Sequence, residues 1–187
     1  MNHHSRKNIS LGGQHLLIWI LMILAIITLF LLGFKWIRAF HLFFGFAWWG
    51  MLFFLNLILL PSMNEMSRSG KYEVLGRVFP KIFKLATVNG FMAVSLGWLL
   101  ALEYFAQWNI TYFFQTSINI LFLTAISVIT LLYLFHLILE RNEIETVLKA
   151  VEKENDEEVN KLLDHLQLVP RIGFIILTLG ALIMFIH

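Results

Sequence analysis

Long apolar stretches alternate with short polar ones along the whole chain. Five of these stretches have the length that a helix needs to cross a bilayer, which is about 20 residues. We predict these spans at about 15–34, 38–60, 81–105, 117–139 and 168–187. The pattern therefore predicts an all-α fold, a polytopic integral membrane bundle of five transmembrane helices that forms a single domain over residues 1–187.

The polar connections refine the expected ends of these helices. A four-residue link, Lys35–Arg38, should join the first two spans, and Pro61 should close the second. The basic connection 62–80 should contain a short surface helix over Lys71–Phe79 that ends at Pro80, because proline disrupts a helix interior. Pro61 and Pro80 are thus each expected to mark the end of a helix.

The two later connections differ strongly in character. The connection 104–116 is aromatic and uncharged, which is typical of a membrane interface. The region 140–167 is strongly charged, and its apolar residues recur at helical spacing. We expect a helical segment there between the fourth and fifth spans, with a second helix that begins at a capping box of Asn155 and Glu158. The predicted apolar faces are Ile144, Val147, Leu148 and Val151, and then Val159, Leu162, Leu163 and Leu166.

Composition supports a membrane protein and excludes several classes of site. The chain is 59% hydrophobic and 14% charged, which is too apolar for a soluble domain of 187 residues. It has no cysteine, so disulfides, thiolate metal sites and covalently attached c-type haem are excluded. We find no motif for nucleic-acid binding, and the expected partner is the lipid bilayer.

Lysine and arginine predict the orientation of the spans. Of the 14 such residues, all but Lys35 and Arg38 fall in the N-terminal tail, in 62–84 or in 140–171. Cytoplasmic loops carry an excess of these residues. We therefore expect the N-terminus and both large connections in the cytoplasm, the segment 140–167 to be cytoplasmic, and the C-terminus outside, with a prokaryotic cytoplasmic membrane as the simplest location.

The second predicted span carries polar groups that lipid cannot satisfy. At helical spacing, one stripe of this span holds His41, Gly45, Trp48, Leu52 and Asn56. An imidazole and an amide in a spanning helix should face other helices. An ionisable side chain in a span is a candidate functional group, so His41 is the centre of the predicted site.

The surroundings of His41 suggest a cofactor. Lys35 and Arg38 should lie just above His41 near the outer face, with Glu103 at the same level. An imidazole that ligates iron below basic groups that meet propionates would suit haem b, with Trp48 as one wall of the site. The alternative is that His41 makes a structural hydrogen bond and that Lys35 and Arg38 are interfacial anchors.

A second histidine, His136, is a weaker candidate for cofactor binding. It falls near the inner end of the fourth span, whereas His41 falls near the outer end of the second, so we expect roughly 20 Å between them. One iron cannot take both histidines from the same chain. An interfacial position for His136, or a role with His165 or Arg171 at the cytoplasmic face, stays open.

Small and amide side chains indicate how the helices meet. Gly90 and Gly97 are seven residues apart, so they share a face of the third span where another helix can approach closely. We expect Asn89 and Asn119 to form hydrogen bonds between helices.

The second span also resembles a known family. Its residues match the pattern His-x-x-x-Gly-x-Ala-Trp-x-Gly-x-x-Phe at His41, Gly45, Ala47, Trp48, Gly50 and Phe53. In this pattern the chain is similar to the membrane domain of PuuD-type urate oxidases and to the related HemJ/CopD-like superfamily of small haem-associated membrane proteins. The resemblance covers roughly 36–187 and implies haem b as the cofactor, with His41 as a ligand of its iron.

The resemblance predicts a function and leaves alternatives open. It implies a haem-b-associated membrane protein that acts in electron transfer or as the membrane part of an oxidoreductase. A HemJ-like protoporphyrinogen IX oxidase is one alternative, although those proteins have a basic Leu-Pro-Arg segment where this chain has Leu60-Pro61-Ser62. The other alternative is a non-catalytic subunit or assembly factor, whose partners would be other membrane subunits or further copies of this chain.

Overall fold

The computed structural model describes residues 11–185, with side chains for 16–138, 142, 145–161, 163–164, 168 and 170–183. Within this range every regular element is a helix and no strand occurs. The predicted all-α class is therefore confirmed for the described part of the chain. The end of the predicted fifth span, 186–187, lies outside it, and so does most of the N-terminal tail.

The first two helices are separated by one residue. Helix α1 (Leu11–Leu32) ends at Gly33, and α2 (Phe34–Phe54) begins directly after it. Gly33 has a φ of 99°, a conformation that glycine adopts without steric cost. The break is thus earlier than predicted. The segment Lys35–Arg38 is not a link, because it belongs to the first turns of α2.

Helix α2 does not end at Pro61 as predicted. It continues through a π-helical segment, η1 (Leu55–Leu59), into α3 (Leu60–Glu65). In the π turn the Leu60 N–H donates to the Leu55 carbonyl, and Pro61 then occupies the first turn of α3. Proline is tolerated in a first turn, because its missing N–H is not needed there.

The next helix repeats this arrangement. After an extended Met66, the segments α4 (Arg68–Glu73), η2 (Val74–Val78) and α5 (Phe79–Tyr104) follow one another without a break. The prediction of a separate surface helix ended by Pro80 is wrong. Pro80 again follows a π segment and occupies the first turn of the next α-helix.

The last two long helices also extend beyond the predicted spans. Helix α6 (Ser117–Phe135) continues through η4 (His136–Glu140) into α7 (Arg141–Glu152), and α8 (Asp156–Phe185) then runs for 30 residues. The Glu158 N–H donates to Asn155 Oδ1 at 3.3 Å, so the predicted capping box begins α8. The predicted second cytoplasmic helix and fifth span are thus one helix that contains Pro170.

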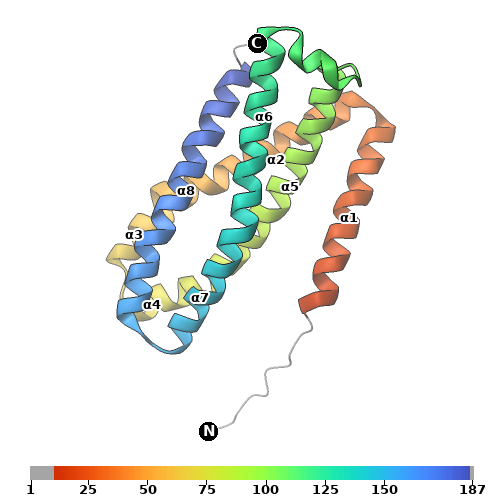
Figure 1. Cartoon of the computed structure of the whole chain (residues 1–187). Helices are drawn as coiled ribbons and strands as arrows, with labels where there is room; N and C mark the ends of the chain where they lie inside the picture. The colour runs from red at the N-terminus through yellow and green to blue at the C-terminus, as the bar shows by residue number, and fades with distance from the viewer. Residues whose placement is uncertain (1–10, 186–187) are drawn as a thin grey trace.

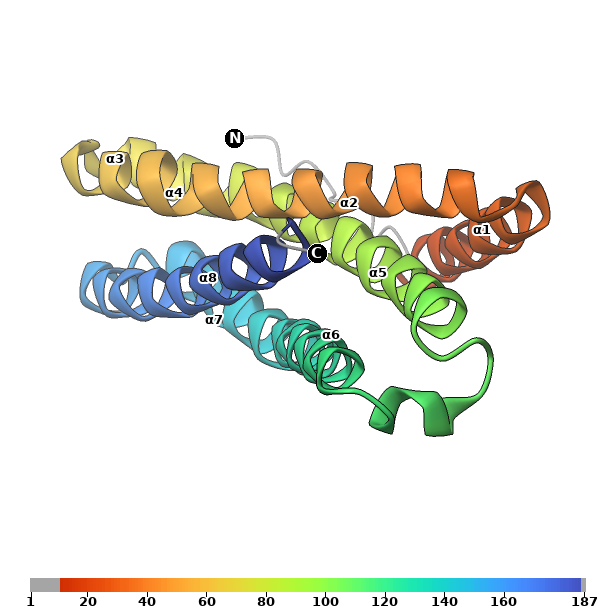
Figure 2. The same cartoon turned by 90° about the horizontal axis from the view of Figure 1, so that it is seen from above.

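The long helices run alternately up and down, which gives the molecule two distinct ends (Figure 1). We call the end with Gly33 and the 105–116 connection the Gly33 end. The opposite end, with Met66–Ser67 and Lys153–Asn155, is the charged end. Seen from above, α2 and α5 cross closely, α6 and α8 lie on one side of them, and α1 lies outside against α2 and α5 (Figure 2).

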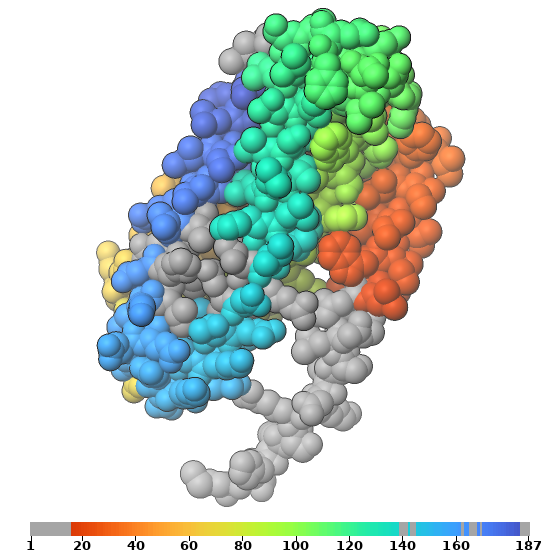
Figure 3. All heavy atoms as spheres, in the orientation of Figure 1, coloured from red at the N-terminus to blue at the C-terminus, as the bar shows by residue number. Residues whose placement is uncertain are grey.

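Residues 105–116 form a bulky knob over the Gly33 end of α5 and α6 (Figure 3). They contain a short 3₁₀ helix, η3 (Ile110–Phe114), whose Phe113 is fully buried. The Asn119 side-chain amide donates to the carbonyls of Phe105 and Tyr112, at 3.2 and 2.9 Å. Asn119 therefore fixes this connection rather than joining two long helices as predicted.

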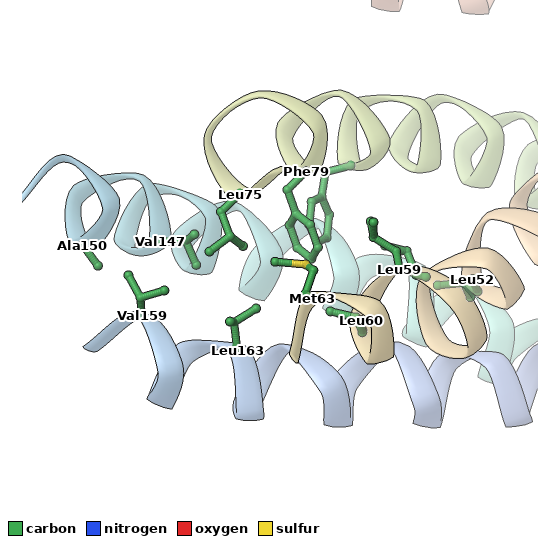
Figure 4. Packing of buried hydrophobic residues seen from close by; sticks show 12 residues of the cluster. Leu52, Leu59, Leu60, Met63, Leu75, Phe79, Val147, Ala150, Val159 and Leu163 are labelled. Carbon is green, nitrogen blue, oxygen red and sulfur yellow. The ribbon is translucent and has the colours of Figure 1, made fainter. Parts of the chain in front are cut away.

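Apolar side chains from several helical segments meet at the charged end (Figure 4). Met63, Leu75 and Phe79 come from α3, η2 and α5, and Val147 and Leu163 come from α7 and α8; all five are buried. Val147 and Leu163 belong to the predicted apolar faces of 140–167, together with buried Val159. The side chains of Ile144, Leu162 and Leu166 lie outside the described residues.

Within the part of the chain that the structure describes, three helices are long and apolar enough to cross a membrane: Phe34–Glu65, Arg68–Tyr104 and Ser117–Ile138. Two more apolar stretches, Leu16–Leu32 and Pro170–Ile183, are shorter. These helices indicate a membrane protein.

Candidate functional site

His41 is tied to α5 by a hydrogen bond that fixes its tautomer. Its Nδ1 lies 2.9 Å from the backbone carbonyl oxygen of Ala93. A carbonyl oxygen only accepts, so Nδ1 must carry the proton and donate it. In the neutral ring the other nitrogen, Nε2, then has the free lone pair, and an imidazole in this state can ligate a metal.

The His41 ring packs directly against Gly97, where there is no room for a side chain. A Cβ atom at Gly97 would lie 3.0 Å from His41 Cε1 and 3.4 Å from Nδ1. The first of these distances is shorter than ordinary van der Waals contact, so any side chain at this position would press on the ring. Gly97 was expected to allow a close approach between helices, and the group that approaches is the candidate ligand itself.

Most of the predicted stripe on α2 faces other helices. Trp48, Leu52 and Asn56 are buried, and His41 makes the contact with α5 described above. Gly45 is the exception, because no atom lies within 4 Å of the position that its Cβ would take. The stripe is thus packed from Trp48 toward the charged end and open at Gly45, one turn from His41.

Trp48 is a core residue in this structure. It is 2% exposed, and its ring meets Tyr133 of α6 edge-on at 5.9 Å. Gly90 makes room for both rings, since its Cβ would lie 2.8 Å from Tyr133 and 3.1 Å from Trp48. The pair Gly90 and Gly97 therefore provides the close approach predicted for it. The role of Trp48 as a wall of a cofactor site stays a prediction.

The charged residues expected above His41 lie at the Gly33 end. Lys35 and Arg38 are exposed in the first turns of α2, and neither forms an ion pair within the described part of the chain. Glu103 accepts a 2.6 Å hydrogen bond from Trp108 Nε1. The Trp108 ring packs against Phe34 at 6.2 Å, which places Glu103 at the level where α2 begins.

His136 is buried, which corrects the expectation of an interfacial histidine. It is 7% exposed, its ring stacks on Phe83 and Tyr133, and its Nε2 lies 3.5 Å from Thr87 Oγ1. It is not at a helix end, because η4 and α7 continue the helix beyond it. It also lines a cavity of about 20 Å³ beside Pro170, which has room for about one water molecule.

The two histidines lie at different levels of α5. His41 meets Ala93 and Gly97, and His136 meets Phe83 and Thr87. Each residue of the first pair lies ten positions after its counterpart in the second, which corresponds to about 15 Å along a helix. This separation is somewhat less than expected, but it keeps the two imidazoles from sharing one iron.

Further polar contacts join the central helices, and sequence reasoning found only part of them. The Asn89 amide donates to Met51 Sδ at 3.9 Å, which gives the contact between helices expected for Asn89. Trp98 Nε1 donates to Thr130 Oγ1 at 2.9 Å, and the Tyr133 hydroxyl donates to the Thr87 carbonyl at 3.2 Å. Tryptophan and tyrosine read as apolar in a hydropathy pattern, so their polar atoms give no signal there.

The donor set around His41 suits a cofactor that needs one protein ligand. No group of three or more His, Cys, Asp or Glu side chains that could hold a metal ion occurs among the described residues. The imidazole of His41 could therefore supply one protein ligand to a cofactor that brings its remaining iron ligands itself, as haem does. Comparisons with family models, with curated proteins and with solved structures give no match to the chain.

Proposed function

We propose that the chain is a haem-b-associated integral membrane protein, acting in electron transfer or as the membrane part of an oxidoreductase. His41 Nε2 is the proposed iron ligand, and the observation that carries the proposal is the hydrogen bond from His41 Nδ1 to the Ala93 carbonyl. A metal-ligating histidine almost always donates its second ring N–H in this way, because the bond orients the ring and makes the ligating nitrogen more basic.

The resemblance of the second span to PuuD-type urate oxidases and to the HemJ/CopD-like superfamily supports the same assignment. When bound, haem b would supply one-electron chemistry at its iron. Lys35 and Arg38, with no ion pair among the described residues, are the proposed partners of its propionates. Because Gly97 has no side chain, the His41 ring can occupy its observed position beside α5.

The proposed placement in the membrane has five spans. Helices α1 and α8 are the first and fifth, and the N-terminus and the charged end face the cytoplasm, in keeping with the positive-inside rule. The alternating direction of the helices supports this topology, since it brings the lysine- and arginine-rich connections to one end (Figure 1). Lys35 and Arg38 then lie at the outer face.

The visible absorbance spectrum of the purified protein tests the cofactor. After expression with ample haem, wild type should show a Soret band, and His41→Ala should lose it while still inserting, because the apolar spans and the charge asymmetry remain. His136→Ala is the matched control and should keep the band, because His136 lies at another level of the bundle.

Two outcomes would contradict this proposal. A wild-type protein without a Soret band would make the His41–Ala93 contact a structural one, of the kind worth about 0.6 kcal/mol between membrane helices. The chain would then be better described as a non-catalytic subunit or assembly factor. Equal haem content in wild type and His41→Ala, at matched expression, would remove His41 as the ligand.

A further inference from the structure

The outward side of the continuous helix formed by η2 and α5 carries a row of cations near the charged end. Arg77, Lys81 and Lys84 are spaced at i, i+4 and i+7, which places them above one another on one side of the helix. All three are exposed. The opposite side of the same turns is buried, with Phe79 and Phe83 in the core. The packing of α5 therefore fixes the direction in which the row points.

The positive charge of this row is largely unbalanced. Arg77 pairs with Glu73 at 3.1 Å, but the two side chains are 77% and 64% exposed, and an exposed pair of this kind is weak. Lys81 and Lys84 form no ion pair within the described part of the chain. The row therefore keeps at least two cations available for a ligand.

Apolar side chains flank the row on the same stretch of helix. Val78 is 39% exposed and Leu85 is 57% exposed. Helix α1 packs on α5 further toward the Gly33 end, where Trp19 meets Phe91 edge-on at 4.9 Å. Cations beside exposed apolar side chains match the boundary between lipid headgroups and acyl chains, where lysine extends its ammonium group toward the phosphates.

We propose that Arg77, Lys81 and Lys84 form a binding site for the phosphate group of an anionic phospholipid. This inference rests on the proposed placement of the charged end at the cytoplasmic leaflet, and it is independent of haem. Basic residues next to a membrane surface are each worth a roughly fivefold gain in affinity for anionic lipid. A lipid fits the row better than a soluble acidic protein does, because the row continues directly into exposed apolar surface.

Lipid-dependent thermal unfolding of the whole chain in neutral detergent micelles tests the site. Phosphatidylglycerol should raise the unfolding midpoint of wild type, and phosphatidylcholine should raise it less. In Lys81→Gln/Lys84→Gln, the phosphatidylglycerol concentration for half of the effect should rise roughly 30-fold, from the loss of two cations. The matched control Lys149→Gln/Lys153→Gln removes the same charge from exposed positions of the α7 end and should behave as wild type.

Several results would overturn the proposal. Unchanged half-effect concentrations in Lys81→Gln/Lys84→Gln would remove the row as the site, and equal weakening in both double variants would assign the effect to net charge. An equal shift with inorganic phosphate alone would indicate a free-anion site instead of a lipid site, and a shift with poly-glutamate but none with phosphatidylglycerol would favour an acidic protein partner. None of these outcomes bears on the haem spectrum, so this inference and the proposed function fail separately.

Discussion

Gly97 lies so close to the His41 ring that the Cβ of an alanine at this position would contact the ring. Gly97→Ala would place a Cβ 3.0 Å from His41 Cε1, so the ring would have to move and its bond to the Ala93 carbonyl would be disturbed. We expect the variant to insert and fold but to bind haem more weakly, because the orienting bond of a metal-ligating histidine is typically worth 10- to 100-fold in affinity. The measurement is haem content by absorbance at matched protein concentration.

A second glycine of the same site region supplies the control for that variant. Nothing lies within 4 Å of the Cβ position at Gly50, so Gly50→Ala adds the same atom without pressing on His41. It should keep wild-type haem content. Equal loss in both variants would mean that alanine disturbs the helices generally, and equal retention would mean that Gly97 does not act through His41.

Asn56 is a buried amide whose oxygen has no hydrogen-bond partner among the described residues. Its Nδ2 donates to the Leu52 carbonyl at 2.8 Å, but Oδ1 has no partner among the described residues. An unsatisfied buried polar atom costs about 1–3 kcal/mol. Asn56→Leu should therefore raise the free energy of unfolding in micelles by about this amount, whereas Asn64→Leu, at an exposed position, should leave it nearly unchanged. A loss of stability in Asn56→Leu would show that Oδ1 is satisfied, for example by water.

Single residues also show what a sequence can and cannot predict about the site. The inward position of His41 was predictable, because an imidazole in an apolar span needs a polar partner. The group that accepts the hydrogen bond from His41 was not predictable. Every helical residue has a backbone carbonyl, and nothing in the sequence distinguishes that of Ala93. The burial of His136 was missed because its span was expected to end three residues later, and the helix continues to Glu152.

At the scale of elements, the pattern of apolar residues correctly predicted where helices occur. The prediction that helices end at Pro61 and Pro80 was wrong, because both helices continue through these residues. Pro61 and Pro80 each come two residues after a five-residue π segment, η1 or η2, and each occupies the first turn of the following α-helix. A rule that treats proline as a boundary assumes an α-helix on both sides. A π turn changes the hydrogen-bond register before the proline, and the amino-acid composition of these segments does not predict such a turn.

Helix α4 is joined to the start of α8 by a small polar cluster. Asp156 Oδ1 accepts hydrogen bonds from the Tyr72 hydroxyl at 2.5 Å and from Arg68 Nε at 2.8 Å. These two bonds, with that of Tyr72 the larger, hold the pKa of the Asp156 carboxyl below its ordinary value. The cluster links two segments far apart in the sequence at the charged end, so its protonation affects how they are held together.

The direction of that pKa shift predicts a pH dependence. Because the pKa of Asp156 is lower in the folded state than in the unfolded state, its contribution to stability is complete above the ordinary aspartate value of about 3.9 and is lost as pH falls through the folded value. Wild type should therefore unfold at a higher temperature than Asp156→Asn at pH 7, and the difference should shrink toward pH 3. A difference between the two midpoints that stays constant over this range would contradict the assignment.

For the whole molecule, the central question is which end faces which side of the membrane. Figure 1 separates the Gly33 end from the charged end, and the proposed topology, which rests on the positive-inside rule, has the charged end in the cytoplasm. The sequence predicted the alternation of helices, because each apolar stretch must cross before a polar connection can leave the bilayer. It could not predict that α7 and the first turns of α8 fold back as an apolar-faced pair onto η2 and α3, since that packing depends on contacts between distant segments.

The absence of cysteine makes this orientation directly testable, because any introduced cysteine is the only thiol in the chain. Ser69→Cys marks the charged end and Gln115→Cys marks the Gly33 end, and both positions are exposed. In intact cells, a membrane-impermeant maleimide added outside should label Gln115→Cys, whereas Ser69→Cys should react only after the cells are opened. The reverse pattern would invert the topology. Labelling of both positions from outside would place the two ends on the same side, which is incompatible with helices that cross the bilayer in alternating directions.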